Sequence, residues 1–230
     1  MYVDDLMKSK STTEEAIVLV SQLRELLASG GFRLPKWYSN ERKVLATIPE
    51  SERAKSVVNL DLEKLPTETA LGLKWNIEED KFVWDVTEKM LQRVSQEPVT
   101  RRGIVSPVYS LFDPLGFIAP YAMKAKLLLQ KLSRKRLGWD DTLEEADKEQ
   151  WKRWLYDLPK LHQIKVDRCF KPKGFGEIKE VELHLFSDAS RQGYAAVAYI
   201  RLKDVTNQVH CAFVVGKARP YVKFRFQDWS

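Results

Sequence analysis

The amino-acid sequence predicts an α+β fold in which helical and strand-forming segments follow one another along the chain. Apolar residues recur at helical spacing after Thr12 and again from about residue 87 to residue 161. Three strand-like runs follow at residues 181–187, 193–202 and 209–216, joined by short polar connections as in an antiparallel meander. With 230 residues, 44% of them hydrophobic, the chain can bury the core of one large domain or two small ones.

The first helix is expected to begin after Thr12. The Thr12 hydroxyl can accept a backbone hydrogen bond from the first turn while Glu15 returns one, which is the capping-box arrangement. Gly30 and Gly31 are expected to end this helix. The apolar positions between the cap and the glycines have helical spacing: Ala16, Val20, Leu23 and Leu27.

The next part of the chain favours a small sheet layer. Short apolar segments occupy residues 42–48, 70–77 and 81–86, and the last of them alternates aromatic with polar residues as a strand does. Residues 76–80 are expected to form the turn between two of these segments.

A helical region is expected from about residue 87 to residue 161, with one interruption where Pro114 and Gly116 would break any helix. Thr142 and Glu145 make a second expected capping box. The helix that follows carries four apolar residues on one face: Trp151, Trp154, Leu155 and Leu158. The tryptophans at 139, 151 and 154 could stack on bases, but their helical spacing favours packing in the core.

The positive charge is unevenly distributed. The net charge is +6 and the pI is about 9.1, which fits a polyanionic partner but also many ordinary proteins. Between Pro114 and Trp139 there is no Asp or Glu, and six basic residues are present: Lys124, Lys126, Lys131, Arg134, Lys135 and Arg136. On a helix, Lys124, Lys131 and Lys135 would form one ridge while Leu127, Leu128 and Leu132 face the core. The ridge is interpreted either as a solvated face or as a nucleic-acid-binding face.

Two adjacent carboxylates, Asp4 and Asp5, follow an aromatic and an apolar residue near the start of the chain. On a tight turn such a pair can bind Mg²⁺ or Mn²⁺, and paired metals catalyse phosphoryl transfer. Most Asp-Asp pairs, however, are solvated turn or cap residues. The two cysteines and three histidines have neither disulfide-framework nor metal-ligand spacing.

Several segments resemble BEL/Pao-type LTR retrotransposon polyproteins, in the order in which that family has them. Residues 2–5 are similar to the Tyr-x-Asp-Asp signature of reverse transcriptases. The other matching segments are residues 31–40 (GFRLPKWYSN), 71–75 (LGLKW), 101–106 (RRGIVS), 111–120 (LFDPLGFIAP), 138–141 (GWDD) and 151–161. Residues 183–190 with 193–197 resemble the start of an RNase H fold. The resemblance extends over about residues 1–217.

The resemblance implies functional residues. Asp4 and Asp5 would be catalytic metal ligands of the polymerase, and Asp188 would be a metal ligand of the RNase H site, although without the resemblance Asp188 is better explained as a residue that caps a turn. Lys36 would act on the departing pyrophosphate or attract the triphosphate, with an ordinary surface lysine as the alternative. The ridge of Lys124, Lys131 and Lys135 would touch duplex phosphates.

The resemblance also implies a domain order. Residues 1–86 would be the C-terminal part of a reverse-transcriptase palm and residues 87–170 a helical thumb and connection region. Residues 171–180, rich in Gly, Pro and Lys, would be a linker. Residues 181–217 would begin an incomplete α/β RNase H-like sheet, and residues 218–230 would be a divergent tail, in which alternating Val222, Phe224 and Phe226 favour a strand.

The implied parent is an RNA-directed DNA polymerase with RNase H activity, which uses Mg²⁺ or Mn²⁺ on an RNA/DNA template-primer duplex, alongside the remaining polyprotein segments. The nucleotide-binding fingers and a further catalytic Asp would precede residue 1, so the isolated chain is expected to be inactive. The alternatives are a non-catalytic nucleic-acid-binding module and a non-functional transposon relic.

The family name "Pao retrotransposon peptidase" suggests an aspartic peptidase, but the sequence has no Asp-Thr/Ser-Gly tripeptide to supply such chemistry. No apolar run approaches the length of a membrane span, and the acidic start is unlike a signal peptide, so a cytoplasmic location without membrane partners is expected.

Overall fold

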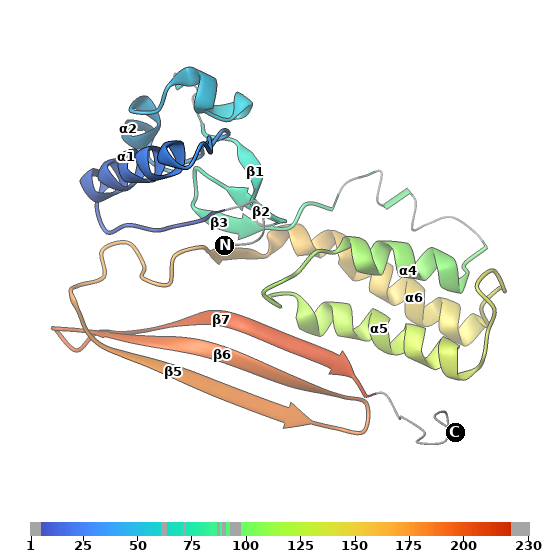
Figure 1. Cartoon of the computed structure of the whole chain (residues 1–230). Coiled ribbons are helices and arrows are strands. Elements are labelled where there is room, and N and C mark those ends of the chain that lie inside the picture. The colour runs from blue at the N-terminus through green and yellow to red at the C-terminus, as the bar shows by residue number, and fades with distance from the viewer. Residues whose placement is uncertain are drawn as a thin grey trace. The chain divides into compact units, whose positions relative to one another are not determined.

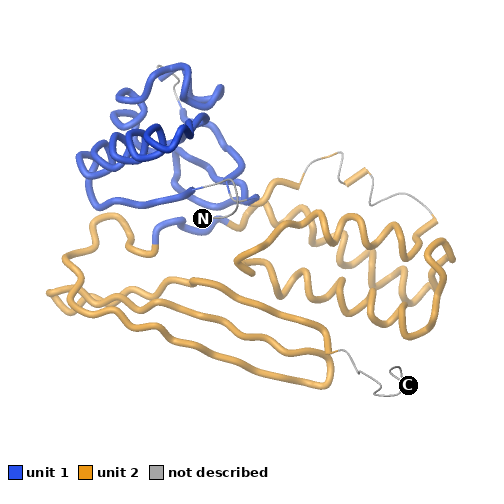
Figure 2. The backbone as a smooth tube through the Cα atoms, viewed as in Figure 1, with its two compact units in different colours: residues 1–83, 165–169 blue, residues 84–164, 170–230 orange. Residues whose placement is uncertain are grey.

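The computed structural model describes residues 6–60, 64–70, 72–86, 88, 91–92 and 98–221, and these confirm an α+β protein. The chain forms two compact units (Figure 2). Unit 1 comprises Met1–Val83 with Lys165–Cys169, and unit 2 comprises Trp84–Ile164 with Phe170–Ser230. None of the helices in the described ranges has the length and apolar character needed to cross a membrane.

The first helix of unit 1, α1 (Thr13–Ser29), has the predicted ends (Figure 1). The backbone N–H of Glu15 donates to Thr12 Oγ1 over 3.1 Å, so Thr12 is the N-cap. The Glu15 carboxylate accepts from the backbone N–H of Ser11 over 3.3 Å, one residue before the position that a capping box uses. Gly30 is the C-cap, as expected.

The expectation of a sheet layer is wrong for residues 42–48. Arg42–Ala46 form the helix α2, and the short 3-10 helices η1 (Glu50–Glu52) and η2 (Lys55–Val57) follow. Val44, Leu45 and Ile48 are buried, and their spacing of one and four residues places them on one helical face. A short apolar run fits a strand or a buried helix equally well, and here the burial pattern follows the helical period.

The sheet of unit 1 has four antiparallel strands in the order β1 (Thr67–Ala70), β2 (Leu73–Asn76), β3 (Lys81–Val83) and β4 (Lys165–Asp167). The predicted turn at residues 76–80 joins β2 to β3. Strand β4 was not predicted, since it lies more than eighty positions after β3 and is only three residues long. It pairs Phe82 with Val166.

The Arg168 side chain, which follows β4, links this strand to Asp80 in the turn between β2 and β3. Arg168 donates from Nε to Asp80 Oδ1 over 2.6 Å and from Nη2 to Asp80 Oδ2 over 2.9 Å. Trp75 Nε1 donates to the same Asp80 Oδ1 over 3.0 Å, and the Arg168 guanidinium lies 5.4 Å from the centre of the Trp75 ring. Both charged side chains are nearly buried, at 10% and 13% exposed, so the bidentate pair is shielded from water.

We predict that Arg168→Ala lowers the free energy of opening of β3 and β4 by about 3 kcal/mol, because it leaves the Asp80 carboxylate buried without its partner. Native-state hydrogen exchange of the amides in these two strands measures this quantity. Lys165→Ala is the matched control, since the Lys165–Glu79 pair joins the same segments but is 44% and 40% exposed. Equal losses in the two variants would contradict the role given to Arg168.

Unit 2 contains the helices α4 (Arg101–Ser110), α5 (Ala119–Arg134) and α6 (Glu145–Asp157), followed by the 3-10 helix η3 (Leu158–Gln163). The predicted break falls between α4 and α5. The predicted capping box at Thr142 is wrong, because α6 begins after Glu144 and makes no side-chain cap hydrogen bond. Thr142 instead forms a β-bridge with Thr100, which holds its backbone extended.

The sheet of unit 2 is the predicted antiparallel meander, in the order β5 (Ile178–Ala189), β6 (Gly193–Asp204) and β7 (Val209–Pro220). The strands are longer than expected, and β5 begins inside the segment predicted as a linker. Helix α5 packs against β7 (Figure 1). The predicted strand at Val222, Phe224 and Phe226 lies outside the described residues.

Candidate nucleic-acid interface

A basic pocket of about 600 Å³ lies on unit 2 between α5, α6 and the turn that joins β5 to β6. Its walls hold five cationic side chains, three amides and one leucine: Lys124, Lys131, Arg134, Lys135, Arg191, Gln130, Gln150, Gln192 and Leu127. The pocket is therefore suited to an anion and not to an apolar ligand.

Helix α5 supplies three of the five cations, and its C-cap residue Lys135 supplies a fourth. Lys124, Lys131 and Lys135 are spaced by seven and four residues, so they share one helical face, as predicted from the sequence. On the opposite face Leu128 and Leu132 are buried. The expectation that Leu127 also faces the core is wrong, because Leu127 lines the pocket.

Two of the three predicted lysines are held by a buried carboxylate. Asp147 on α6 is only 1% exposed, and its two oxygens lie 2.5 Å from Lys131 Nζ and 2.8 Å from Lys135 Nζ. Lys135 Nζ also lies 2.7 Å from Glu144 Oε2. Burial alone would raise the pKa of Asp147, but the hydrogen bonds from the two lysines hold it below its ordinary value. The hydrogen bond to Asp147 correspondingly raises the pKa of Lys135.

The remaining cations of the pocket are Lys124, Arg134 and Arg191, and none of them makes an ion pair with any residue that the structure describes. Arg134 Nη2 donates to the backbone carbonyl of Tyr221 over 3.3 Å, which keeps its guanidinium beside the residue that follows β7. Arg191 comes from the β5–β6 turn. Sequence reasoning missed it because a turn and a helix about sixty positions apart can be brought together only by tertiary contacts.

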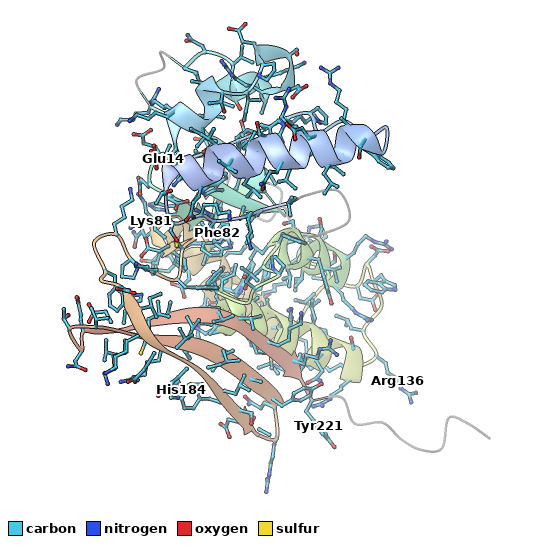
Figure 3. All side chains as sticks on the ribbon, turned by 60° about the vertical axis from the view of Figure 1, so that its left-hand side comes forward. Glu14, Lys81, Phe82, Arg136, His184 and Tyr221 are labelled. Carbon is cyan, nitrogen blue, oxygen red and sulfur yellow. The ribbon has the colours of Figure 1, made fainter. Side chains whose placement is uncertain are left out.

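The basic stretch does not act as one surface. Lys126 and Arg136 do not line the pocket, and Figure 3 shows the Arg136 side chain pointing outward from the end of α5. The sequence alone did not show that these two residues lie outside the pocket while their neighbours line it.

Asp188, predicted as a metal ligand, lies near the end of β5 opposite Ala195. Its side chain is exposed, and its Oδ1 accepts a hydrogen bond from the Ala189 backbone N–H over 2.8 Å. Across the described ranges, no three His, Cys, Asp or Glu side chains come together as a metal site.

The other predicted catalytic residues belong to the N-terminal part of the chain. Asp4 and Asp5 lie outside the described residues. Lys36 is exposed and has a φ of 65°, a left-handed backbone conformation, immediately before Trp37 forms a β-bridge with Arg53. None of the residues that the structure describes forms a hydrogen bond or an ion pair with the Lys36 side chain, which is exposed to solvent.

The tryptophans of unit 2 have two different roles. Trp151 and Trp154 are buried, and their rings stack at 4.8 Å, which confirms the expected core packing. Trp139 is 49% exposed, so that expectation is wrong for it. It lies on a loop after α5, where the Arg101 guanidinium covers its ring at 4.2 Å.

The model of the Pao retrotransposon-like RNaseH-like domain matches residues 100–223. The chain belongs to this family. The match confirms the resemblance to BEL/Pao retrotransposons, and it extends from the start of α4 to the end of β7, so the helices and the sheet of unit 2 fall within one matched domain. No curated protein matches the chain at a significant level.

We predict that the carboxylate of Asp147 contributes fully to the stability of unit 2 above about pH 4 and progressively less as the pH falls below that value. Its pKa in the folded protein is lower than the ordinary 3.8, so its contribution is complete above that value and is lost as the pH falls through the folded pKa. Asp147→Asn should lower the unfolding free energy by about 2 kcal/mol at pH 7, since it removes hydrogen bonds to charged groups.

Urea denaturation at pH 7 and at pH 3 tests this expectation. The difference between the wild type and Asp147→Asn should be smaller at pH 3 than at pH 7, because below pH 3.8 the unfolded chain already binds the proton that the folded carboxylate resists. Glu149→Gln on the same helix is the control, because Glu149 pairs with Lys152 at about half exposure. If the stability difference between the wild type and Asp147→Asn is the same at both pH values, the ion pairs of Asp147 with Lys131 and Lys135 do not stabilise unit 2.

Proposed function

We propose that unit 2 is a nucleic-acid-holding part of a retrotransposon polymerase and RNase H polyprotein, and that it grips the phosphates of an RNA/DNA duplex in the basic pocket. The observation that carries this proposal is the convergence of Lys124, Arg134 and Arg191, three cations without ion pairs, from two separate parts of the fold. Membership of a Pao retrotransposon family supports a nucleic acid as the polyanion.

Phosphates are the better ligand for this pocket than base edges. No aromatic side chain lines it, so bases have nothing on which to stack. Three glutamines accompany the cations, at positions 130, 150 and 192, and amide N–H groups complement arginine and lysine in binding phosphate oxygens. Such contacts fix the position of a duplex without selecting its sequence.

The three lysines predicted to contact phosphates have different roles in this proposal. Lys124 retains its role, whereas Lys131 and Lys135 are already bound to Asp147 and Glu144 and would have to leave them to reach a phosphate. Their charge is largely compensated locally, so Arg134 and Arg191 take over the direct contacts. Removing Lys131 or Lys135 would mainly affect stability, because Asp147 would be left buried beside fewer cations.

We predict that the triple variant Lys124→Gln, Arg134→Gln, Arg191→Gln binds duplexes more weakly to a similar degree whatever their sequence. The wild type should bind with a Kd of about 10⁻⁴ to 10⁻⁶ M at physiological salt, the range of non-specific phosphate contacts. In the variant, the slope of log K against log salt concentration should flatten by about 2.7, or 0.9 for each lost contact.

The matched control is Lys171→Gln, Lys173→Gln, Lys179→Gln, which removes the same charge from exposed positions outside the pocket. Fluorescence anisotropy with RNA/DNA and DNA duplexes over a series of salt concentrations gives both affinity and slope. If the two triple variants lose affinity equally, net charge alone explains binding and the pocket has no special part in it.

We further propose that the isolated chain is catalytically incomplete. In the intact parent, Asp4 and Asp5 would serve the polymerase and Asp188 the RNase H site, with Lys36 near the triphosphate. A two-metal reaction needs several convergent carboxylates, and among the described residues Asp188 belongs to no group of three or more metal-ligating side chains. The alternative of a non-functional relic predicts neither duplex binding nor catalysis.

We predict that the purified chain does not extend a DNA primer on an RNA template with Mg²⁺ or Mn²⁺. A primer-extension assay, with a complete reverse transcriptase as the positive control, measures this. Extension that disappears in Asp4→Asn would mean that the chain, or an assembly of it, holds a complete polymerase site.

A further inference from the structure

A second pocket lies beside the basic pocket, along the contact between α5 and α6. The two helices pack side by side (Figure 1), and the second pocket between them has a volume of about 290 Å³. Lys124 on α5 and Gln150 on α6 line both pockets. The two pockets therefore adjoin at these two side chains, and one ligand can extend from one pocket into the other.

The second pocket differs in chemistry from the basic pocket. The buried part of its lining is apolar and consists of Ala125, Leu128 and Trp154. Its lining also includes the carboxylate of Asp157, whereas no Asp or Glu is among the described residues that line the basic pocket. The hydrogen bond from Lys160 lowers the pKa of Asp157, so this carboxylate is charged at neutral pH. A phosphate is therefore disfavoured in the second pocket, because it would meet a like charge and an apolar wall.

The polar side chains of the second pocket include both hydrogen-bond donors and acceptors. Arg153 can donate, Asp157 can accept, and the Gln150 amide can do both. A nucleobase has the matching combination, because its ring faces are apolar and its edges carry donors as well as acceptors. Since the adjoining basic pocket is suited to phosphates, a nucleotide can satisfy both pockets at once.

Trp154 gives the second pocket a fixed wall. Its ring stacks on the rings of Tyr121 and Trp151, with ring centres 4.7 Å and 4.8 Å apart. Its Nε1 donates to the Tyr121 carbonyl over 3.2 Å, and the Tyr121 hydroxyl donates to the Trp154 carbonyl over 2.8 Å. The apolar wall is thus ordered before a ligand arrives, which lowers the entropic cost of binding.

Only an unpaired nucleotide can readily place its base in the second pocket. A volume of about 290 Å³ is at the lower end of the range for small-molecule sites, so the pocket has room for one base and not for a base pair. Within a duplex the bases are stacked and paired, and extruding one of them costs energy. A nucleotide in a single-stranded overhang does not carry this cost.

We propose that the second pocket receives an unpaired base, and that the strand then passes Lys124 and Gln150 into the basic pocket, where its phosphates bind. The preferred ligand of unit 2 is then a duplex with a single-stranded overhang. This inference rests on the proposed function, because it requires nucleic-acid phosphates in the basic pocket.

Fluorescence anisotropy of the full chain tests the role of the base. The ligands are a blunt duplex, the same duplex with a short overhang of mixed sequence at its 3′ or its 5′ end, and both overhangs with abasic sites in place of the bases. At one of the two ends, the overhang with bases should bind about tenfold more tightly than its abasic counterpart, as expected for one or two added hydrogen bonds. The two ligands have the same number of phosphates, so their difference reports only the base.

A charge-neutral double variant tests whether the second pocket is the site. Arg153→Ala with Asp157→Ala removes one positive and one negative group from this pocket and leaves the lining of the basic pocket intact. It should lose the preference for bases and bind the blunt duplex as the wild type does. The matched control is Glu149→Ala with Lys152→Ala, which removes an exposed ion pair from the same helix outside both pockets and should keep the preference. Circular dichroism verifies that both variants fold.

The outcomes separate this inference from the proposed function. Equal binding of overhangs with and without bases at both ends, or an unchanged preference in the Arg153 and Asp157 variant, would overturn the inference. Blunt duplexes would in that case still bind through the basic pocket. A wild-type chain that binds none of these ligands would contradict the inference and the proposed function together.

Discussion

The architecture of unit 2 depends on one close approach of two backbones, between the turn before α5 and the last strand of the sheet. Gly116 has a φ of 82°, and a Cβ on it would clash with the Gly216 carbonyl oxygen. The Gly216 N–H donates to the carbonyl of Leu115 over 2.7 Å. Because both positions lack a side chain, the helical segment can approach β7 to hydrogen-bonding distance.

The turn that presents Gly116 is itself built by a single carboxylate. The two oxygens of Asp113 accept hydrogen bonds of 2.9 Å from the backbone N–H groups of Gly116, Phe117 and Ile118. These donors would otherwise be unsatisfied at the start of α5. The turn then directs α5 along β7, and Phe117 packs on Phe213 with ring centres 4.9 Å apart. The pocket exists because this arrangement places the β5–β6 turn beside α5.

Features that depend on neighbouring residues were predictable from the sequence. The cap at Thr12, the break at Asp113–Gly116, the meander of three strands and the shared face of Lys124, Lys131 and Lys135 all follow from local spacing. Local patterns failed where two structures satisfy the same pattern. The apolar run at residues 42–48 forms a helix, and the threonine expected to cap α6 pairs with Thr100 instead.

Features that join distant parts of the chain could not be predicted. Asp147 was not singled out from the sequence, yet its burial against Lys131 and Lys135 decides which cations of the pocket remain without ion pairs. Arg191 and β4 are similar cases, since each acquires its role by contact with a segment far away in the sequence. The family match over residues 100–223 agrees with this picture, because it treats the helices and the sheet as one domain.

The hydrogen-exchange rate of the Gly216 amide shows whether the helices of unit 2 are joined to the sheet at this contact. On a free-standing sheet this N–H would point outward from the β7 edge and exchange rapidly. With the Leu115 carbonyl bound to it, we expect exchange as slow as that of the amides between β6 and β7, and rapid exchange in Gly116→Ala while the β6–β7 amides stay protected. Rapid exchange of Gly216 in the wild type would mean that the helices and the sheet are not joined at this contact.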